Sequence, residues 1–137
     1  MTDLERHASE YVDEAKAAVE SVTAAELADE LEHGDVTVVD VREDRERWGD
    51  GAISGSVHAA RGTIEYSADP ESKYYVEGFD PAKRYVCHCG GGARGAMAAA
   101  RLQEMGYRDV AYLEGGFSAW RDAGYEVEET GVPDSFR

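Results

Sequence analysis

The sequence predicts an α/β domain in which helices cover both faces of a parallel sheet. Three segments read as buried strands, VTVVDV (36–41), RYVCHC (84–89) and DVAYL (109–113), and the first is a continuous apolar run. Segments with helical spacing lie between them along the chain. Strands that alternate with helices in this way are typical of parallel sheets buried on both faces.

Two helices are predicted before the first of these strands. Residues 3–20 carry apolar side chains at helical spacing, namely Leu4, Ala8, Tyr11, Ala15, Ala18 and Val19. In the segment 21–35, Thr23 and Glu26 form a capping-box pattern, Leu27 and Leu31 supply an apolar stripe, and Gly34 ends the helix. We therefore divide the chain into an N-terminal helical extension, 1–19, and a domain, 20–137.

The remaining elements follow the same logic. Residues 42–83 are predicted to be loop-rich with short elements, residues 94–105 to form an alanine-rich helix that ends at Gly106, and residues 117–124 to form a closing helix. Trp48 and Trp120 are assigned to packing.

In parallel α/β sheets, ligands bind beyond the carboxyl ends of the strands. The segment CHCGGGARG, Cys87 to Gly95, lies at one such end.

Composition excludes several classes of function. The 137 residues include 29 acidic and 14 basic side chains, for a formal net charge of -15, so a nucleic acid is excluded as a partner. The acids are spread along the chain, which favours a high-salt (halophilic) cytoplasm over an acidic but ordinary mesophilic protein. The first residues lack an apolar run, and no later stretch approaches a membrane span, so we expect a cytoplasmic protein without a membrane partner.

The glycine-rich turn after the second strand predicts an anion-binding nest. Glycines let successive backbone N–H groups point inward, and the helix that follows adds its positive N-terminal end. Cys89 stands at the start of this turn, where we expect it to exist as a thiolate. The turn lacks the spacing of a dinucleotide fingerprint and the Gly-Lys-Ser/Thr of a phosphate loop. We predict no cofactor.

The chain resembles the rhodanese-like domain family, and the resemblance spans most of its length. The motifs that carry it are VVDVRE (38–43), GAISGSVHAARGTIEY (51–66), CGGGARG (89–95), AAARLQEMGYRDV (98–110) and LEGGFSAW (113–120). The resemblance implies a five-stranded parallel sheet flanked by helices. It also implies a cysteine that carries sulfur as a persulfide, taken from thiosulfate or a related anion and passed to a nucleophilic acceptor.

Carried over residue by residue, the resemblance makes Cys89 the catalytic cysteine and Arg94 the arginine that closes the loop. The predicted substrate-binding residues are Gly90, Gly91, Gly92, Ala93, Arg94, Gly95 and Arg61, with Asp40 and Arg42 as supporting residues. Three positions depart from the family pattern: the family often has histidine at Ala52, proline at Ala60 and serine at Gly95. These departures bear on substrate choice more than on the chemistry.

Several residues allow two interpretations. Cys87 is predicted to be a small buried core residue, with a resolving thiol for Cys89 as the alternative. No metal site is predicted, because the adjacent residues Cys87, His88 and Cys89 cannot converge on one ion. Asp40 and Arg42 are predicted to tie loops together rather than touch substrate. Arg61 either binds an anionic donor or pairs with Glu65 at the surface.

Three classes of function remain open. The first is a sulfurtransferase that uses a small anionic sulfur donor and a thiol, cyanide or protein acceptor. The second is a phosphatase or arsenate reductase of the same fold, whose members carry one more residue between cysteine and arginine than the four that separate Cys89 from Arg94. The third is a sulfur carrier or partner-binding module with little turnover. The loop length favours the first class over the second.

Overall fold

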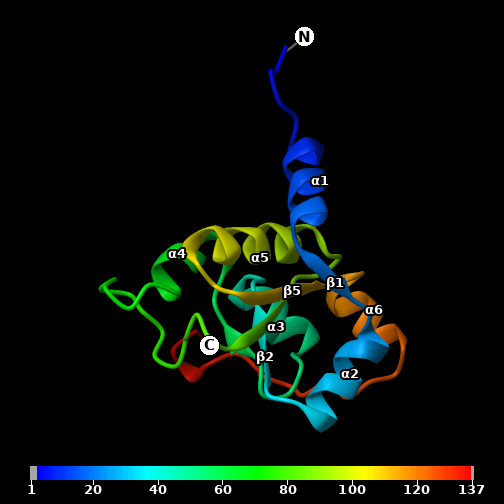
Figure 1. Ribbon diagram of the computed structural model, residues 1–137. Helices are drawn as coiled ribbons and strands as arrows, with labels where there is room; N and C mark the ends of the chain where they lie inside the picture. Colours follow the sequence, from blue (N-terminus) through cyan, green and yellow to red (C-terminus); the bar gives the residue numbers. More distant parts are fainter. Residues whose placement is uncertain (1–2, 137) are drawn as a thin grey trace.

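The computed structural model describes residues 3–136, and these contain a five-stranded sheet. Figure 1 shows the arrangement of the chain around it. All neighbouring strands are parallel, in the order β1-β5-β4-β2-β3. The strands are β1 (Glu20–Val22), β2 (Val36–Asp40), β3 (Val57–His58), β4 (Arg84–His88) and β5 (Asp109–Leu113). The predicted parallel α/β fold with five strands is therefore confirmed. Residues 1, 2 and 137 of the predicted extension and domain lie outside the described residues.

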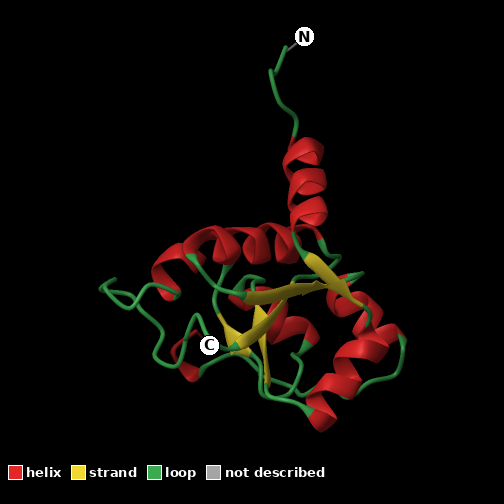
Figure 2. Ribbon diagram, in the orientation of Figure 1, coloured by secondary structure: helices red, strands yellow, loops and turns green. Residues whose placement is uncertain are grey.

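Helices cover both faces of the sheet (Figure 2). They are α1 (Ala8–Ala18), α2 (Ala24–His33), α3 (Asp44–Asp50), α4 (Ile64–Ser67), α5 (Ala93–Met105) and α6 (Gly116–Asp122), with short 3-10 turns η1 (Arg61–Thr63) and η2 (Asp134–Phe136). One buried cluster joins the sheet to α1, α4 and α5, and a second joins the opposite face to α2 and α6.

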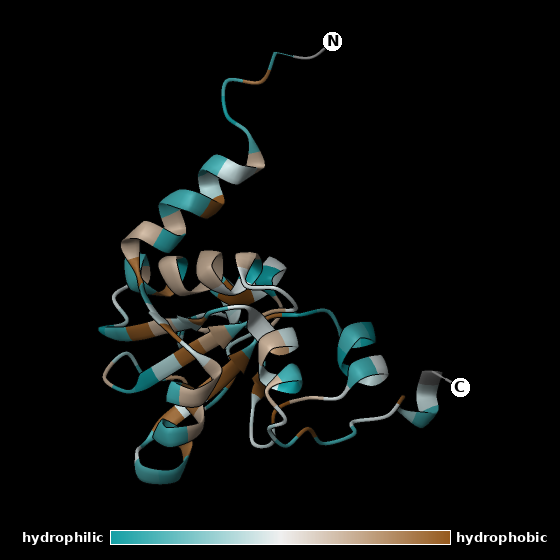
Figure 3. Cartoon of the chain, turned by 90° about the vertical axis from the view of Figure 1, so that its right-hand side faces the viewer, coloured by the Kyte–Doolittle hydropathy of each residue, from teal (hydrophilic) through white to brown (hydrophobic). Residues whose placement is uncertain are grey.

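The side chains of β4 show why the strands read as buried on both faces. Tyr85 and Cys87 belong to the cluster under α5, whereas Val86 between them belongs to the cluster under α2 and α6. Successive side chains of a strand point to opposite faces, so a strand covered on both sides has apolar residues at consecutive positions. Figure 3 shows the hydrophobic segments gathered along these central strands.

The capping box predicted for the second helix is present at the start of α2. The Thr23 hydroxyl accepts the backbone N–H of Glu26 at 3.1 Å, and the Glu26 carboxylate accepts the backbone N–H of Thr23 at 2.8 Å. The helix stops at Gly34, as predicted. Leu27 is fully buried against the sheet, a contact of the kind that contributes about 1.5–3 kcal/mol.

The N-terminal helix is shorter and more exposed than its sequence pattern predicts. It begins at Ala8, so Leu4 lies before it and is exposed. Ala15 and Val19 are buried at the end next to α5, whereas Tyr11 is 49% exposed. Figure 1 shows α1 projecting from the domain, and Figure 3 shows hydrophilic and hydrophobic residues alternating along it. The periodicity correctly predicts a helix, but only its last turn is packed.

Two short edge strands complete the sheet. β1 pairs with β5 through three residues, and β3 pairs with β2 through two. The loop-rich region 42–83 contains α3, β3, η1 and α4, in agreement with the prediction of short elements. The proposed division at residues 19 and 20 falls between α1 and β1 and stays a prediction.

Candidate active site

The site forms where two central strands of the sheet end side by side. β2 pairs with β4 so that Asp40 lies beside His88, and Cys89 follows directly. The backbone N–H of Val41 continues this pairing by donating to the His88 carbonyl at 2.9 Å. The loops after the two strands therefore start at the same edge, where ligands of parallel sheets bind.

The Cys89 thiol is held inside its own loop. The backbone N–H of Gly92 donates to Cys89 Sγ at 3.0 Å, and Gly92 is the N-cap of α5 with a left-handed φ of 115°. Gly91 and Ala93 are exposed, whereas Cys89 is only 2% exposed at the base of the loop. The sulfur therefore lies at the N-terminal end of a 13-residue helix and accepts a backbone N–H of the turn that begins this helix.

Helix α6 fixes the orientation of the loop from behind. The backbone N–H of Phe117 donates to the Cys89 carbonyl at 2.8 Å, and that of Ser118 donates to the Gly90 carbonyl at 3.1 Å. In a trans peptide the N–H points opposite to the C=O, so the N–H groups of Gly90 and Gly91 point away from α6. These bonds fix the orientation of two peptide groups of the loop, while the predicted anion-binding nest stays a prediction.

Two glycines allow the close approach of the helices to this loop. Gly116 has a φ of 60°, and a Cβ there would lie 2.6 Å from the Cys89 carbonyl oxygen. A Cβ on Gly95 would lie 3.0 Å from His88 Cα and 3.2 Å from the Cys87 carbonyl oxygen. The first turn of α5 thus packs closely on the end of β4, and a side chain at Gly95 would require its neighbours to shift by a few tenths of an ångström.

Arg94 is held by a carboxylate of α3. Its two terminal nitrogens donate to the two oxygens of Glu46 at 2.7 and 2.8 Å, a bidentate pair. These hydrogen bonds from Arg94 hold the pKa of Glu46 at about 2, and the pairing with Glu46 raises the pKa of Arg94. A Cβ on Gly90 would lie 3.5 Å from Arg94 Nη2 and 3.8 Å from Glu46 Oε2. The pair therefore borders the loop one residue after Cys89.

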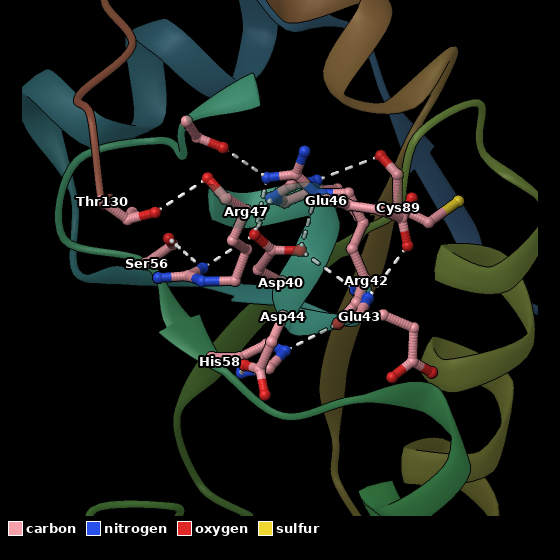
Figure 4. A network of polar contacts seen from close by, with 12 residues as sticks. Asp40, Arg42, Glu43, Asp44, Glu46, Arg47, Ser56, His58, Cys89 and Thr130 are labelled. Carbon is pink, nitrogen blue, oxygen red and sulfur yellow. Dashed lines mark hydrogen bonds and ion pairs between the residues drawn. The ribbon is translucent and has the colours of Figure 1, made fainter. Parts of the chain in front are cut away.

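Asp40 lies at the centre of a buried polar network (Figure 4). It accepts hydrogen bonds from the backbone and side chain of Arg42 at 2.9 to 3.0 Å, and from Arg47 at 2.7 Å. Burial alone would raise the pKa of Asp40, but these donors and nearby positive charge outweigh it and lower the pKa to about 2. The predicted contact between Asp40 and Arg42 is thus present.

Arg42 extends this network to other parts of the fold. Its Nη2 donates to the Gly51 carbonyl at 2.7 Å, and its guanidinium lies 4.2 Å from the centre of the Phe117 ring. The chain after β2, the turn at Gly51 and the start of α6 are therefore joined by one buried side chain. This arrangement fits the predicted loop-tying role of Asp40 and Arg42.

Arg61 lies apart from the contacts of the Cys89 loop. Its side chain pairs with Glu65 at 3.7 Å and lines a groove of about 300 Å³ between α1 and α5, together with Tyr11, Ala15 and Met97. Its Nε is buried without a hydrogen-bond partner. Of the two interpretations of Arg61, the structure contains the ion pair with Glu65, and binding of an anionic donor stays a prediction.

Cys87 is fully buried within β4, as predicted for a core residue. Burial raises the pKa of its thiol to about 12, so it is protonated at neutral pH. Both cysteines are free thiols. Among the described residues, one group, Asp29, Glu32 and His33 of α2, brings potential metal-ligand atoms within 4.8 Å of one another, and all three are exposed. Such surface groups are common without an ion.

The sequence did not identify three parts of the site. Glu46 read as one acid among many, although its place beside the first strand end could have suggested a partner for Arg94. Gly115 and Gly116 belong to the motif LEGGFSAW, but the sequence did not assign them a role in the site. Both have a positive φ, which lets the start of α6 lie against the Cys89 loop. His88 is buried, its Nδ1 lies 3.2 Å from the Cys89 carbonyl oxygen, and burial lowers its pKa.

A cysteine at the first position of a glycine loop, which follows a parallel strand and leads into a helix, is the arrangement of a cysteine-loop α/β domain. The family model described as "Rhodanese-like domain" matches residues 23–123. The chain therefore belongs to the rhodanese-like domain family.

Individual relatives agree on the fold and differ in name. The thiosulfate sulfurtransferase GlpE of Pseudoalteromonas translucida is 30% identical over 82% of this chain and 98% of its own length. The dual specificity phosphatase Cdc25 of Arabidopsis thaliana is 29% identical over 80% of this chain and 78% of its own length.

Among solved structures, a Rhodopseudomonas palustris protein of unknown function, named a possible tyrosine phosphatase, superposes with a TM-score of 0.88. It is 40% identical, and the match covers 93% of this chain and 98% of that one. A rhodanese-like domain protein from Staphylococcus aureus superposes with a TM-score of 0.65 at 31% identity, over 80% and 98% of the two chains. Within the described residues, none of the helices has the length and apolar character needed to cross a bilayer.

Proposed function

We propose that the protein is a sulfurtransferase that moves sulfane sulfur from a donor to a nucleophilic acceptor through a persulfide on Cys89. The observation that carries this proposal is the 3.0 Å hydrogen bond from the Gly92 N–H to Cys89 Sγ. The carbonyls of Cys89 and Gly90 are bonded to α6, so the loop that supplies this N–H donor is held in place before any donor binds.

The reaction has two steps. The Cys89 thiolate attacks the outer sulfur of thiosulfate, the S–S bond breaks, and sulfite leaves with the electron pair. The negative charge then rests on the terminal sulfur of the persulfide, where loop N–H groups stabilise it. An acceptor thiolate or cyanide attacks that terminal sulfur, and Cys89 is restored as a thiolate. No redox partner or cofactor is needed for either step.

A phosphatase activity is the second candidate, because two of the relatives carry phosphatase names. The loop supports it less well. Four residues separate Cys89 from Arg94, one fewer than in phosphatases and arsenate reductases of this fold. In addition, both terminal nitrogens of Arg94 donate to Glu46, so a phosphoryl group would have to compete with this carboxylate for the guanidinium.

The proposed partners are a small sulfur donor and a thiol, cyanide or protein acceptor, with no nucleic acid, membrane or cofactor. A reducing cytoplasm is part of the proposal, since both cysteines are free thiols. A carrier that holds sulfur for another enzyme would use the same Cys89 persulfide. It differs from a sulfurtransferase only in slow release to small acceptors.

Intact-protein mass spectrometry tests the proposal. After incubation with excess thiosulfate, the wild type and Cys87→Ser should gain the mass of one sulfur atom, and Cys89→Ser should not. Cyanide should then remove the added sulfur and yield thiocyanate. Sulfur loading that persists in Cys89→Ser would refute the assignment. Hydrolysis of an aryl phosphate without any sulfur loading would favour the phosphatase.

A further inference from the structure

The positive charge beside the loop is neutralised in the folded protein. Arg94 is the only charged residue from Cys89 to Gly95. Its guanidinium is paired through both terminal nitrogens with the carboxylate of Glu46, and Glu46 is stabilised in its ionised form. A bidentate pair of this kind is the strong form of a carboxylate–guanidinium contact. An anionic donor that uses Arg94 must therefore displace Glu46 or bind next to its negative charge.

Other arginines near the strand ends are paired as well. Arg42 and Arg47 donate to the buried carboxylate of Asp40, and Arg61 pairs with Glu65. A further acid, Glu43, is close enough to Arg94 to contribute to its raised pKa, after the larger effect of Glu46. Arg42, Arg47 and Arg94 are thus each paired with a carboxylate, on a chain with a formal charge of -15. With these arginines neutralised, the net negative charge of the chain opposes the approach of a doubly charged anion.

We propose that Glu46 is a specificity-determining residue that disfavours dianionic donors and makes a persulfide, R–S–SH, the preferred sulfur donor. This inference rests on the proposed sulfur transfer at Cys89. A persulfide carries one negative charge or none, so the Glu46–Arg94 pair repels it less than it repels thiosulfate. The recognised chemistry is a sulfane sulfur bonded to a thiol, whatever the rest of the donor.

The step with a persulfide balances without a further reactant. The Cys89 thiolate attacks the outer sulfur of R–S–SH, the bond between the two donor sulfurs breaks, and the thiolate R–S⁻ leaves with the electron pair. The transferred sulfur keeps its proton, which gives Cys89–S–SH. The leaving group is a thiolate rather than sulfite, so one charge rather than two must depart past Glu46.

Glu46 also has a structural role, which the test variant must preserve. Its Oε1 accepts the backbone N–H of Glu43 at 3.0 Å and caps α3. Glu46→Gln keeps an amide oxygen for this bond and for Arg94 but removes the charge. Glu65→Gln is the matched control, because it removes one carboxylate charge beside Arg61 and changes the net charge equally.

The experiment measures the rate of Cys89 loading by intact mass at fixed ionic strength, with thiosulfate and with cysteine persulfide as donors. The wild type should load faster with cysteine persulfide. In Glu46→Gln the ratio of the thiosulfate rate to the persulfide rate should rise by ~10-fold, because a charge within a few ångströms of the donor is removed. In Glu65→Gln this ratio should stay at the wild-type value.

The outcomes separate this inference from the proposed function. Loading by both donors with the same rate ratio in all three proteins would overturn the role of Glu46 alone. An equal rise of the ratio in Glu65→Gln would also overturn it, since net charge would then be the cause. Loading by neither donor in any protein would overturn sulfur transfer at Cys89, and this inference with it.

Discussion

The interior of β4 at Cys87 and the loop at Cys89 place the same side chain in two different environments. Both residues are almost fully buried, at 0% and 2% exposure, so burial does not distinguish them. Cys87 is surrounded by core side chains, and burial raises its pKa to about 12. Cys89 receives the Gly92 N–H and lies at the start of α5. Donors at a strand end, rather than exposure, mark the candidate nucleophile.

The largest expected difference between the two thiols is in alkylation. Iodoacetamide at neutral pH should modify Cys89 at least ~100-fold faster than Cys87, because Cys89 needs only local opening of a loop whereas Cys87 needs the sheet to open. Peptide mass mapping over time measures both rates in one sample. Equal rates in the folded protein would show that the two environments do not differ in reactivity.

A second prediction concerns the support that only the Cys89 loop receives. In Gly116→Ala the new Cβ would meet the Cys89 carbonyl at 2.6 Å, so the loop must shift and sulfur loading should fall by at least ~10-fold. Gly124→Ala is the control, because Gly124 also has a positive φ, 86°, but nothing lies within 4 Å of its added Cβ. Melting temperatures of both variants separate loss of fold from loss of the loop. Equal loading in the two variants would contradict the role of α6.

A third prediction concerns the buried network beside the loop. Because the pKa of Asp40 is lowered from 3.8 to about 2, ionised Asp40 stabilises the folded protein above pH 4, and this stability is lost as the pH falls through about 2. The contribution is about 2 kcal/mol. Asp40→Asn lacks this contribution and also leaves Arg42 and Arg47 unpaired, for a total cost of about 3–5 kcal/mol at neutral pH, and its difference from the wild type should shrink as the pH falls toward 2.

Urea unfolding at neutral and acidic pH measures this effect. Asp109→Asn is the control, since Asp109 is 56% exposed in its ion pair with Arg84 and should cost less than about 1 kcal/mol. If the two substitutions cost the same, the buried network would contribute no more than a surface ion pair.

Salt should change the difference in reactivity between Cys87 and Cys89 least, because it acts on the stability of the whole domain. The formal charge of -15 destabilises the compact state by self-repulsion, and at 1 M salt the Debye length falls to about 3 Å. We expect the melting temperature to rise by several degrees from low to molar potassium chloride, with the alkylation preference for Cys89 retained. A flat response would reject the halophilic interpretation of the composition.

The sequence predicted the central part of the fold because local patterns are strong there. Strands β2, β4 and β5 are buried on both faces, and their apolar runs are too short for helices. The Thr23 capping box and Gly106 mark helix ends by local chemistry alone. The edge strands β1 and β3 were not located, because three and two residues that pair at a sheet edge leave no period in the sequence.

The sequence also predicted the part of the candidate site that lies in one continuous segment. Cys89, its glycines and Arg94 are contiguous, so one motif names them together. Glu46 is 48 residues from Arg94, and Phe117 is far along the chain from Cys89. Contacts of this kind depend on how the sheet brings loops together, and a single sequence carries no record of the pairing. The exposure of Tyr11 was also unpredictable, since helical periodicity does not say how much of a face is covered.

The bonds from α6 to the Cys89 loop also set when the site can form during synthesis. A chain emerges from the ribosome at roughly 5–20 residues per second, so Cys89 appears some seconds before Phe117, whose N–H holds its carbonyl. Strand β1 must likewise wait for β5 before it has a partner. A nascent chain that ends before α6 carries the cysteine but not the geometry around it. The hydrogen bonds that orient the Cys89 loop can therefore form only when nearly the whole domain has been made.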